Sequence, residues 1–424
     1  MPQAVLYNLG CSKNIVDGER ILHCARQAGY TVTDTADEAD IIIVNTCAFI
    51  REAQEEAIET ILTAARHKGS HAKLIVSGCF SERFREEVAE EFPEVDVWAG
   101  VNDWEHLLGT MLKTSPSPFK RTLSEPLSTQ YIKIAEGCSH GCSFCVIPSI
   151  RGRYRSREWK AVREEMRWLE EQGTQELILV AQDSSFYGRD THSTLTSLLE
   201  KVLSSCSIPW IRIMYLHPAF VDKQLLSLIA AEKRICSYFD LPLQHIADPI
   251  LRSMKRKPLR EGIINLIGEI RSTVPDAAIR TAFIAGYPGE SEKEFNELLS
   301  FIEWAKFDRL GVFPYSPEEG TPAALLRPRP RNSTAQRRCE TIMLAQRDIS
   351  RELNERKTGT FCEVIIDRVS DDPDFNFEAR TRADAPEVDG RVLIRNGDAD
   401  IGSIRTVRII GASDYDLFAE QPDE

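Results

Sequence analysis

Residues 136–157 read EGCSHGCSFCVIPSIRGRYRSR, and three cysteines fall within the first ten of them in the spacing C-x3-C-x2-C. Zinc and iron–sulfur centres are commonly held by four ligands, so three thiolates leave one position open. His140 would complete a zinc site, although structural zinc sites more often combine two short arms from separate parts of a chain. The loop therefore predicts a 4Fe-4S cluster with one open iron, and zinc is the alternative.

The region that follows this loop alternates strand-like and helix-like segments. A first strand, YIKIAEG, leads into the cysteines, and helical patterns such as REWKAVREEMRWLEEQG separate the strands after it. Six strand–helix units are too few for a closed barrel of eight, but they would form a partial (β/α)6 barrel with its active site at the carboxyl ends of the strands. The later candidate strands are ELILVAQD, WIRIMYLHP, YFDLPLQH, IRTAFIAGYP and RLGVFPYSP.

The region before the loop repeats another pattern three times. The apolar segments AVLYNLG, ADIIIVNT and AKLIVSG lead to Cys11, Cys47 and Cys79, and an amphipathic helical pattern follows each cysteine. Such alternation predicts an open parallel α/β sheet, whose strands share one rim where ligands bind. One such cysteine alone would be read as a small buried hydrophobe. Three at equivalent places, 36 and 32 residues apart, are expected to converge.

Composition shifts divide the chain into domains. The stretch 114–129 is rich in Ser, Thr and Pro and predicts a linker. A long helical pattern at about 333–357 ends the central region, and short alternating segments broken by Asp, Pro and Gly follow it. They predict a small antiparallel β-barrel. The expected fold class is therefore multidomain α/β, with domains at 1–113, 130–357 and 358–424.

Charge and cysteine content restrict the function. The chain has 424 residues and a net charge of -13, which disfavours general nucleic-acid binding. Its longest apolar runs are far too short to span a membrane, and its start lacks the pattern of a secretory signal. Eleven cysteines in a chain of this kind favour metal binding or catalysis over disulfides. We expect a cytoplasmic protein, because thiols stay reduced there.

The charge is unevenly distributed along the chain. Residues 359–424 contain 16 Asp and Glu against 7 Arg and no Lys, so this module favours a basic partner over a nucleic-acid backbone. One feature favours RNA as the partner instead, because a basic cluster could contact RNA phosphates. It is the run of alternating arginines at 151, 153, 155 and 157. For most of them, pairing with carboxylates or capping a helix is the simpler interpretation.

The C-x3-C-x2-C loop resembles the signature of radical S-adenosylmethionine (SAM) enzymes, and with the three earlier cysteines the whole chain resembles the methylthiotransferases of that superfamily. One branch, MiaB, modifies an adenosine of transfer RNA and usually follows its first cysteine with Gln-Met-Asn. The other branch, RimO, modifies an aspartate of the small-subunit ribosomal protein uS12. LGCSKNIVDGE at 9–19 is similar to the RimO branch, although Gly18 departs from the commoner Ser. Further segments similar to RimO are CSFCVIPSIRGRYRSR, LPLQHIADPILRSMKR, FPYSPEEGTPA and ADAPEVDG.

The resemblance implies two 4Fe-4S clusters, each with an open iron. The first cleaves SAM to a radical that removes hydrogen from the β-carbon of the aspartate, and the second carries the sulfur or methylthio group to that carbon. It also implies a small ribosomal subunit or free uS12 as partner and an electron donor such as flavodoxin. The implied ligands of the first cluster are Cys138, Cys142 and Cys145, called the downstream trio below, and those of the second are Cys11, Cys47 and Cys79, called the upstream trio.

Four further residues are candidate cofactor contacts by the same resemblance. Phe144 stands where the family places a bulky residue whose backbone contacts the adenine, and Gln182 and Asp183 end the strand ILVAQD. Arg280 and AGYPGE are expected near another strand end. For each, a polar group satisfied locally is an equal alternative. The competing functions are methylthiolation of transfer RNA and non-catalytic iron–sulfur or zinc binding.

Overall fold

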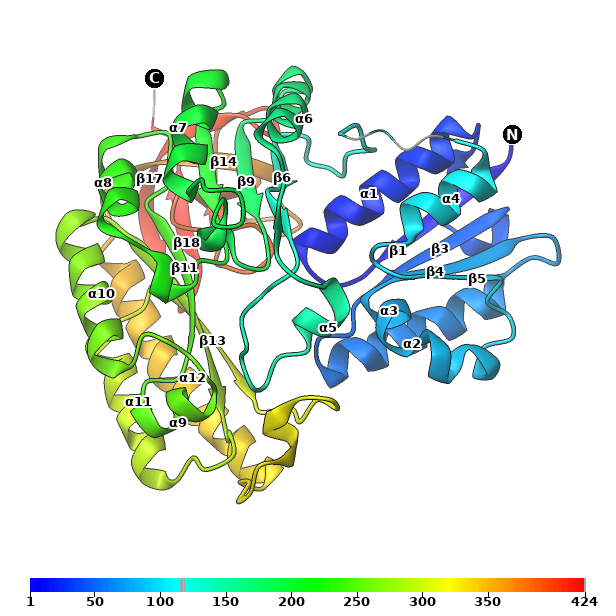
Figure 1. The fold of residues 1–424 in the computed structure, drawn as a ribbon. Helices are drawn as coiled ribbons and strands as arrows, with labels where there is room; N and C mark the ends of the chain where they lie inside the picture. Colours follow the sequence, from blue (N-terminus) through cyan, green and yellow to red (C-terminus); the bar gives the residue numbers. More distant parts are fainter. Residues whose placement is uncertain (115–116, 118, 423–424) are drawn as a thin grey trace.

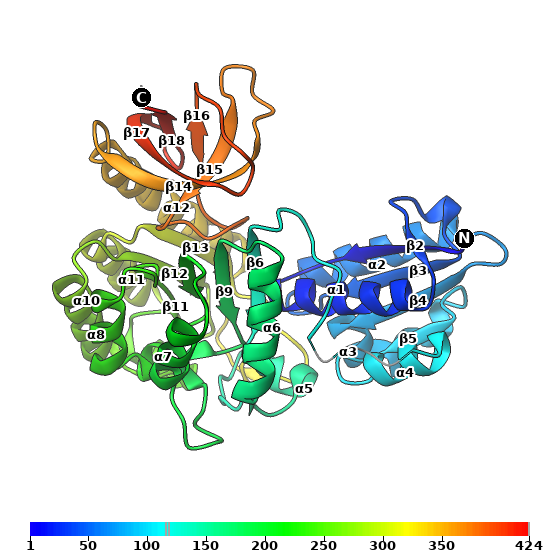
Figure 2. The same cartoon turned by 90° about the horizontal axis from the view of Figure 1, so that it is seen from above.

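The computed structural model describes residues 1–114, 117 and 119–422 (Figure 1). Residues 115, 116 and 118 of the expected linker, and residues 423–424 of the expected C-terminal domain, lie outside the described residues. Three bodies are visible in Figure 2, where an N-terminal sheet and a C-terminal barrel each pack against a central domain. The domain limits expected from the sequence remain predictions.

The N-terminal body is a parallel five-stranded sheet in the order β2-β1-β3-β4-β5. In β3 the side chains of Ile41 and Ile43 pack with residues of α1 and α4, and those of Ile42 and Val44 pack with residues of α2 and α3. Figure 1 shows the two pairs of helices on opposite faces of the sheet. A sheet covered on both faces explains the uninterrupted apolar run in this strand. The elements are β1 (Gln3–Asn8), α1 (Ser12–Gln27), β2 (Thr31–Val32), β3 (Ile41–Thr46), α2 (Arg51–His67), β4 (Lys73–Gly78), α3 (Cys79–Val88), β5 (Val97–Ala99) and α4 (Trp104–Leu112).

The central body contains six parallel strands in two sheets of three, ordered β10-β9-β6 and β11-β12-β13. A parallel bridge between Ile211 and Ile235 joins the two sheets on one side. No pairing joins the described residues of β6 and β13 on the other side, so the barrel is partial, as expected. Its elements are β6 (Thr129–Lys133), β7 (Ala135–Glu136), α5 (Ile147–Arg151), β8 (Arg155–Ser156), α6 (Trp159–Glu171), β9 (Glu176–Val180), α7 (Leu195–Ser205), β10 (Trp210–Ile213), α8 (Lys223–Ala231), β11 (Tyr238–Gln244), α9 (Asp248–Ser253), α10 (Arg260–Thr273), β12 (Ala278–Ala285), α11 (Glu292–Ala305), β13 (Arg309–Pro314) and α12 (Asn332–Glu355).

Short 3-10 helices connect several of these elements. They are η1 (Ala36–Glu38), η2 (Ala89–Glu91), η3 (Ser184–Phe186), η4 (Pro218–Phe220) and η5 (Pro322–Leu325). No helix of the described residues is long and apolar enough to cross a membrane.

The C-terminal body is a closed barrel in the order β14-β15-β16-β18-β17. All neighbouring strands are antiparallel except β16 and β18, which run parallel. The short alternating segments of the sequence are FCEVIIDRV, NFEARTRAD, GRVLIRN and IRTVRIIGAS, which contain β14 to β17. They do not include β18, whose four residues are too short to show an alternation. The strands are β14 (Phe361–Val369), β15 (Phe377–Thr381), β16 (Val392–Ile394), β17 (Ile404–Ala412) and β18 (Leu417–Glu420).

Buried ion pairs attach the C-terminal barrel to the amino-terminal ends of the central strands. Glu176, the first residue of β9, lies 2.9 Å from the Arg380 guanidinium of β15 and 2.7 Å from that of Arg212. Arg309, the first residue of β13, pairs with Asp384 of the barrel at 2.5 Å. The downstream trio follows β6 and β7 at the other end of these strands. The barrel therefore docks opposite the cysteine loop.

Candidate functional site

The upstream trio lies at the carboxyl ends of three adjacent strands. Cys11 follows β1 as the N-cap of α1, Cys47 follows β3, and Cys79 begins α3 directly after β4. Cys47 and Cys79 are buried, each 9% exposed. Because β1, β3 and β4 are neighbours in the sheet, the three cysteines lie at one rim.

Two glycines allow the cysteine loops to approach each other. Gly10 and Gly78 precede Cys11 and Cys79 and both have φ of 92°. A Cβ on Gly10 would lie 2.7 Å from the Cβ of Cys47, and one on Gly78 would lie 2.5 Å from the carbonyl oxygen of Thr46. Only glycine tolerates both the conformation and the contact. The repeated Gly-Cys pair is a sequence signal for these residues that our sequence analysis did not use.

Positive charge surrounds the upstream trio. Burial acts to raise the pKa of Cys11, but Lys13 and Arg151 outweigh it and leave that pKa below its usual value. Burial raises the pKa of Cys79 to about 11 despite Arg151, whose Nη2 donates a hydrogen bond to the Cys79 Sγ at 3.3 Å. Cations beside three thiols suit a negatively charged thiolate-ligated centre.

The downstream trio lies in the loop between β7 and α5. Burial raises the pKa of Cys138 to about 11 and that of Cys145 to about 12. Nη1 of Arg256 lies 3.7 Å from the Sγ of Cys142, and the Ser143 hydroxyl anchors the loop by donating to the Ser253 carbonyl at 2.7 Å. The loop is therefore a preformed, partly buried thiol site.

The donor set of the two trios fits iron–sulfur clusters. Among the described residues, no group of three or more Cys, His, Asp and Glu side chains is arranged so that it could hold a metal ion. Nε2 of His140 lies 2.6 Å from Asp183 Oδ2, so that ring nitrogen is engaged in a hydrogen bond. A set of three cysteine thiols suits a 4Fe-4S cluster, which is held by thiolates and can keep one iron open.

The predicted cofactor contacts do not all lie near the downstream trio. Asp183 reaches the cysteine loop through His140, and Nε2 of Gln182 donates to Glu136 at 2.8 Å. Phe144 lies in the loop and packs against Met254 and its apolar neighbours. The roles of Asp183, Gln182 and Phe144 as cofactor contacts therefore stay predictions.

Arg280 differs from the expectation in its position. We expected it near a strand end on the active rim, but it is the third residue of β12, towards the amino-terminal end. There it pairs with Asp240 at 2.9 Å and with Asp389 of the C-terminal barrel at 3.4 Å. Arg280 is the second residue of the predicted strand IRTAFIAGYP, so the sequence already placed it at the amino-terminal end and the expectation was wrong.

The arginines after the cysteine loop have separate environments. Arg151 and Arg157 are mostly buried in ion pairs, with Asp17 at 2.9 Å and Glu165 at 2.7 Å. Arg153 and Arg155 are exposed. Pairing with carboxylates, the simpler interpretation of this run, holds for Arg151 and Arg157.

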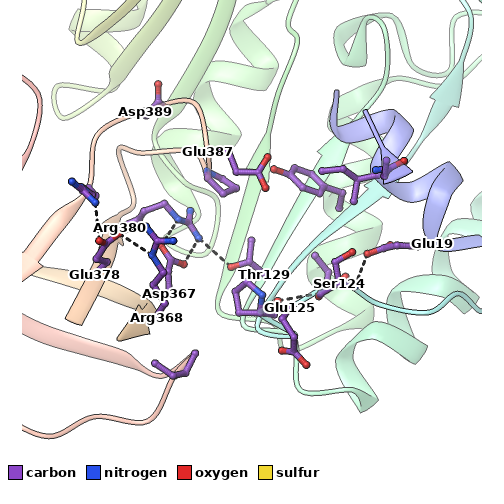
Figure 3. Close-up of a pocket in the computed structure, with 18 of the residues that line it drawn as sticks. Glu19, Ser124, Glu125, Thr129, Asp367, Arg368, Glu378, Arg380, Glu387 and Asp389 are labelled. Carbon is purple, nitrogen blue, oxygen red and sulfur yellow. Dashed lines mark hydrogen bonds and ion pairs between the residues drawn. The ribbon is translucent and has the colours of Figure 1, made fainter. Parts of the chain in front are cut away.

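A cavity of about 840 Å³ separates the N-terminal body, the end of the linker and the C-terminal barrel (Figure 3). It reaches Gly10, the residue before Cys11, and Tyr131 of β6 lies on its wall. Its carboxylates outnumber its guanidinium groups. The charged lining residues are Glu19, Glu125, Asp367, Arg368, Glu378, Arg380, Glu387, Asp389 and Arg391.

Three family models match the chain. The family described as uncharacterized protein family UPF0004 matches residues 3–100, the radical SAM superfamily matches residues 132–302, and the TRAM domain matches residues 358–421. Each matched segment lies within one of the three bodies of the fold, and the radical SAM match ends before β13 and α12. They support the predicted α/β multidomain class.

Relatives are similar along nearly the whole chain. The ribosomal protein uS12 methylthiotransferase RimO of Geobacter sulfurreducens is 41% identical over 435 residues, covering 98% of this chain and 97% of that protein. The protein of the same name from Syntrophus aciditrophicus is also 41% identical, over 440 residues, with 98% and 97% covered. Both alignments include all three bodies.

A solved structure shares the fold at low sequence identity. The radical SAM methyltransferase TsrM of Kitasatospora setae, with cobalamin and a [4Fe-4S] cluster bound, superimposes with a TM-score of 0.56 and 16% identity. The match covers 77% of this chain and 74% of that chain. It confirms the fold class that the sequence predicted.

Proposed function

Because the chain belongs to the RimO family of radical SAM methylthiotransferases, we propose that it adds a methylthio group to the β-carbon of an aspartate in ribosomal protein uS12. The family and the radical SAM fold make it an enzyme that uses a 4Fe-4S cluster and SAM. The observation that carries the finer proposal is the convergence of the upstream trio at one rim, beside a second, separate thiol loop.

The proposed ligands are the upstream trio for one 4Fe-4S cluster and the downstream trio for the other. When bound, the clusters and SAM supply a carbon radical that can remove hydrogen from an unactivated carbon, and a sulfur group for that carbon, which no side chain can supply. The protein's own side chains hold the clusters and orient the reactants. Phe144, Gln182, Asp183 and Arg280 stay proposed cofactor contacts, and Arg280 is the least favoured because it pairs with the C-terminal barrel.

The cavity supplies a route for the protein substrate. Glu125 and Glu387 are exposed residues of its lining and define what we call its mouth (Figure 3). Gly10, which precedes Cys11 of the upstream trio, is another lining residue. A basic segment of uS12 would be attracted by these carboxylates and would reach the sulfur-carrying site. Partners of this proposal are uS12 or the small ribosomal subunit, and an electron donor such as flavodoxin. It also implies a cytoplasmic location.

The experiment is mass analysis of substrates after anaerobic incubation of the reconstituted protein with SAM, sulfide and reductant. Small ribosomal subunits and transfer RNA are supplied together. We expect a methylthio increment on an aspartate of uS12. An increment on a transfer RNA adenosine would keep the chemistry and reject the substrate, and no increment on either would reject the function.

A further inference from the structure

A single buried arginine connects the two thiol sites. Arg151 ends α5, the five-residue helix that begins two residues after Cys145, so it is attached directly to the loop of the downstream trio. Its side chain is 4% exposed and points into the N-terminal body. There its Nη2 donates a hydrogen bond to the Sγ of Cys79 at 3.3 Å.

The same guanidinium reaches the other two upstream cysteines through Asn14. Nη2 of Arg151 also donates to Oδ1 of Asn14, which is fully buried. Nδ2 of Asn14 in turn donates to the carbonyl oxygens of Leu9 and Thr46, both at 2.9 Å. Thr46 immediately precedes Cys47, and Leu9 stands two residues before Cys11. Arg151 and Asn14 together therefore contact the segments that carry all three upstream cysteines.

Carboxylates hold Arg151 from the opposite side. Its Nη1 lies 2.9 Å from Oδ2 of Asp17 and 3.3 Å from Oε1 of Glu136. Glu136 also accepts a hydrogen bond from Gln182, at the active rim of the central barrel. Lys133 contacts both carboxylates, so the cluster contains two cations and two anions. The guanidinium is fixed by this cluster, because moving away from Cys79 would leave two carboxylates with Lys133 as the one cation of the cluster.

A fixed cation and an N–H donor beside a cluster-ligating sulfur have a known electrostatic consequence. Reduction adds one negative charge to a cluster, and both features stabilise the added charge. Removal of the cation lowers the reduction potential. A residue that only filled space would leave the potential unchanged.

We propose that Arg151 is a positioning residue of the sulfur-carrying site, which aligns the upstream trio with the downstream trio and raises the reduction potential of the upstream cluster. This inference rests on the proposed function in one respect, that the upstream trio holds a 4Fe-4S cluster. Arg151 itself contacts no reacting atom and acts through Cys79 and Asn14.

The chain contains a matched control in Arg121. It is also buried, and it joins α1 to the central domain through Glu19 at 2.8 Å, Glu165 at 3.5 Å and the Tyr131 carbonyl. None of these contacts is a cysteine. Arg121→Met therefore removes a buried guanidinium with two carboxylate partners, as Arg151→Met does, but leaves the upstream trio untouched.

The experiment uses the full chain with Cys138, Cys142 and Cys145 replaced by Ala, so that only the upstream trio can hold iron. After anaerobic reconstitution, iron is counted and the cluster is titrated with reductant while its paramagnetic resonance spectrum is recorded. If this parent binds no iron, the second cluster of the proposed function is rejected and this inference with it. If the parent binds about four irons per chain, the upstream cluster is present, and the reduction potentials of the variants then test the role of Arg151.

Arg151→Met is expected to lower the reduced-to-oxidised ratio about tenfold at a fixed potential, which equals a shift of about 59 mV for one electron. Arg151→Lys keeps the charge but lacks the fork that reaches both Asn14 and Cys79, so a smaller downward shift is expected. Arg121→Met should leave the potential at the parent's value. If Arg151→Met does not fold, Arg151→Lys tests the proposal instead. An unchanged reduction potential in Arg151→Lys would then contradict it. Equal potentials in the Arg151 and Arg121 variants would overturn the proposal.

Discussion

Gly78 has a positive φ and lies against the backbone of Thr46, so its missing side chain is what lets Cys79 stand beside Cys47. We expect Gly78→Ala to cost about 1–2 kcal/mol for the left-handed conformation, with a further cost because a Cβ would meet the Thr46 oxygen. Iron bound after reconstitution should fall from about eight to about four per chain, because only the upstream cluster would be lost.

Gly29→Ala is the control for this change. Gly29 has φ of 89°, and a Cβ there would meet nothing within 4 Å. It should lower the unfolding temperature slightly and leave the iron content unchanged. Equal iron losses in the two variants would show that conformation alone, rather than the approach of the cysteine loops, decides cluster binding.

The two trios predict different losses when one cysteine of each is removed. Cys142→Ala should abolish SAM cleavage, whereas Cys47→Ala should retain part of the cleavage and lose sulfur transfer. Chromatography of 5'-deoxyadenosine and mass analysis of uS12 measure the two steps separately. The same pattern of loss in both variants would contradict the division of labour between the sites.

At the scale of elements, the segment between β9 and η3 connects the rim of the central barrel with the downstream trio. Burial acts to raise the pKa of Asp183, but hydrogen bonds from His140 and Ser185 outweigh it, so the carboxylate is the favoured form. Asp183→Asn replaces by an amide a carboxylate that accepts hydrogen bonds from His140, Ser185 and the backbone of His217. A lost bond to a buried charge costs about 1.5–3 kcal/mol, so SAM cleavage should fall at least tenfold.

Asp190→Asn provides the comparison within the same loop region. Asp190 accepts hydrogen bonds from the backbone and hydroxyl of Ser156 at an exposed position. Its replacement should leave the rate of SAM cleavage near that of the parent protein, with iron content equal in both variants. A similar fall in rate for both would assign the effect to the loop and not to the site.

At the scale of the whole molecule, Glu176 joins the C-terminal barrel to the central domain. Its carboxylate is fully buried between Arg212 and Arg380, and Glu176→Gln would leave two guanidinium groups poorly compensated. Breaking a buried pair of this kind costs about 3–5 kcal/mol. Hydrogen exchange should show β14–β18 losing protection, whereas Glu352→Gln, in an exposed pair with Lys306, should not change it.

The same carboxylate predicts a pH dependence. Burial acts to raise the pKa of Glu176, but Arg380 and Arg212 outweigh it, and the pKa is lowered in the folded protein. Its contribution to stability is therefore complete above the unfolded pKa of about 4.3 and is lost as the pH falls through the folded value. The difference in unfolding free energy between the parent and Glu176→Gln should narrow below about pH 4. A constant difference would argue against the charge as its source.

The cavity predicts how the substrate binds. Glu125→Lys and Glu387→Lys reverse charges at its mouth, so the dissociation constant for uS12 should rise and depend less on salt. SAM cleavage without uS12 should not change. A charge reversal at Glu340 of α12, outside the cavity lining, should leave both quantities as they are. Unchanged affinity in the mouth variants would place the substrate elsewhere.

The amino-acid sequence by itself determined the features that depend on local spacing. Strand–helix alternation predicted the parallel sheet and the partial barrel, because hydrophobic periodicity reports which residues face a core. The rule that parallel strands share a carboxyl rim brought Cys11, Cys47 and Cys79 together. The C-x3-C-x2-C spacing identified the downstream trio within a single loop.

Only the tertiary structure decided the contacts between parts distant in sequence. Arg151 and Cys79 are 72 residues apart, and Arg151 and Asp17 are 134 apart. The docking of the barrel through Arg380 and Glu176, and the closure of that barrel by β18, likewise join distant segments. Periodicity reports burial but not the partner, because many folds bury the same residues against different neighbours. The choice of partner is made when whole domains pack together.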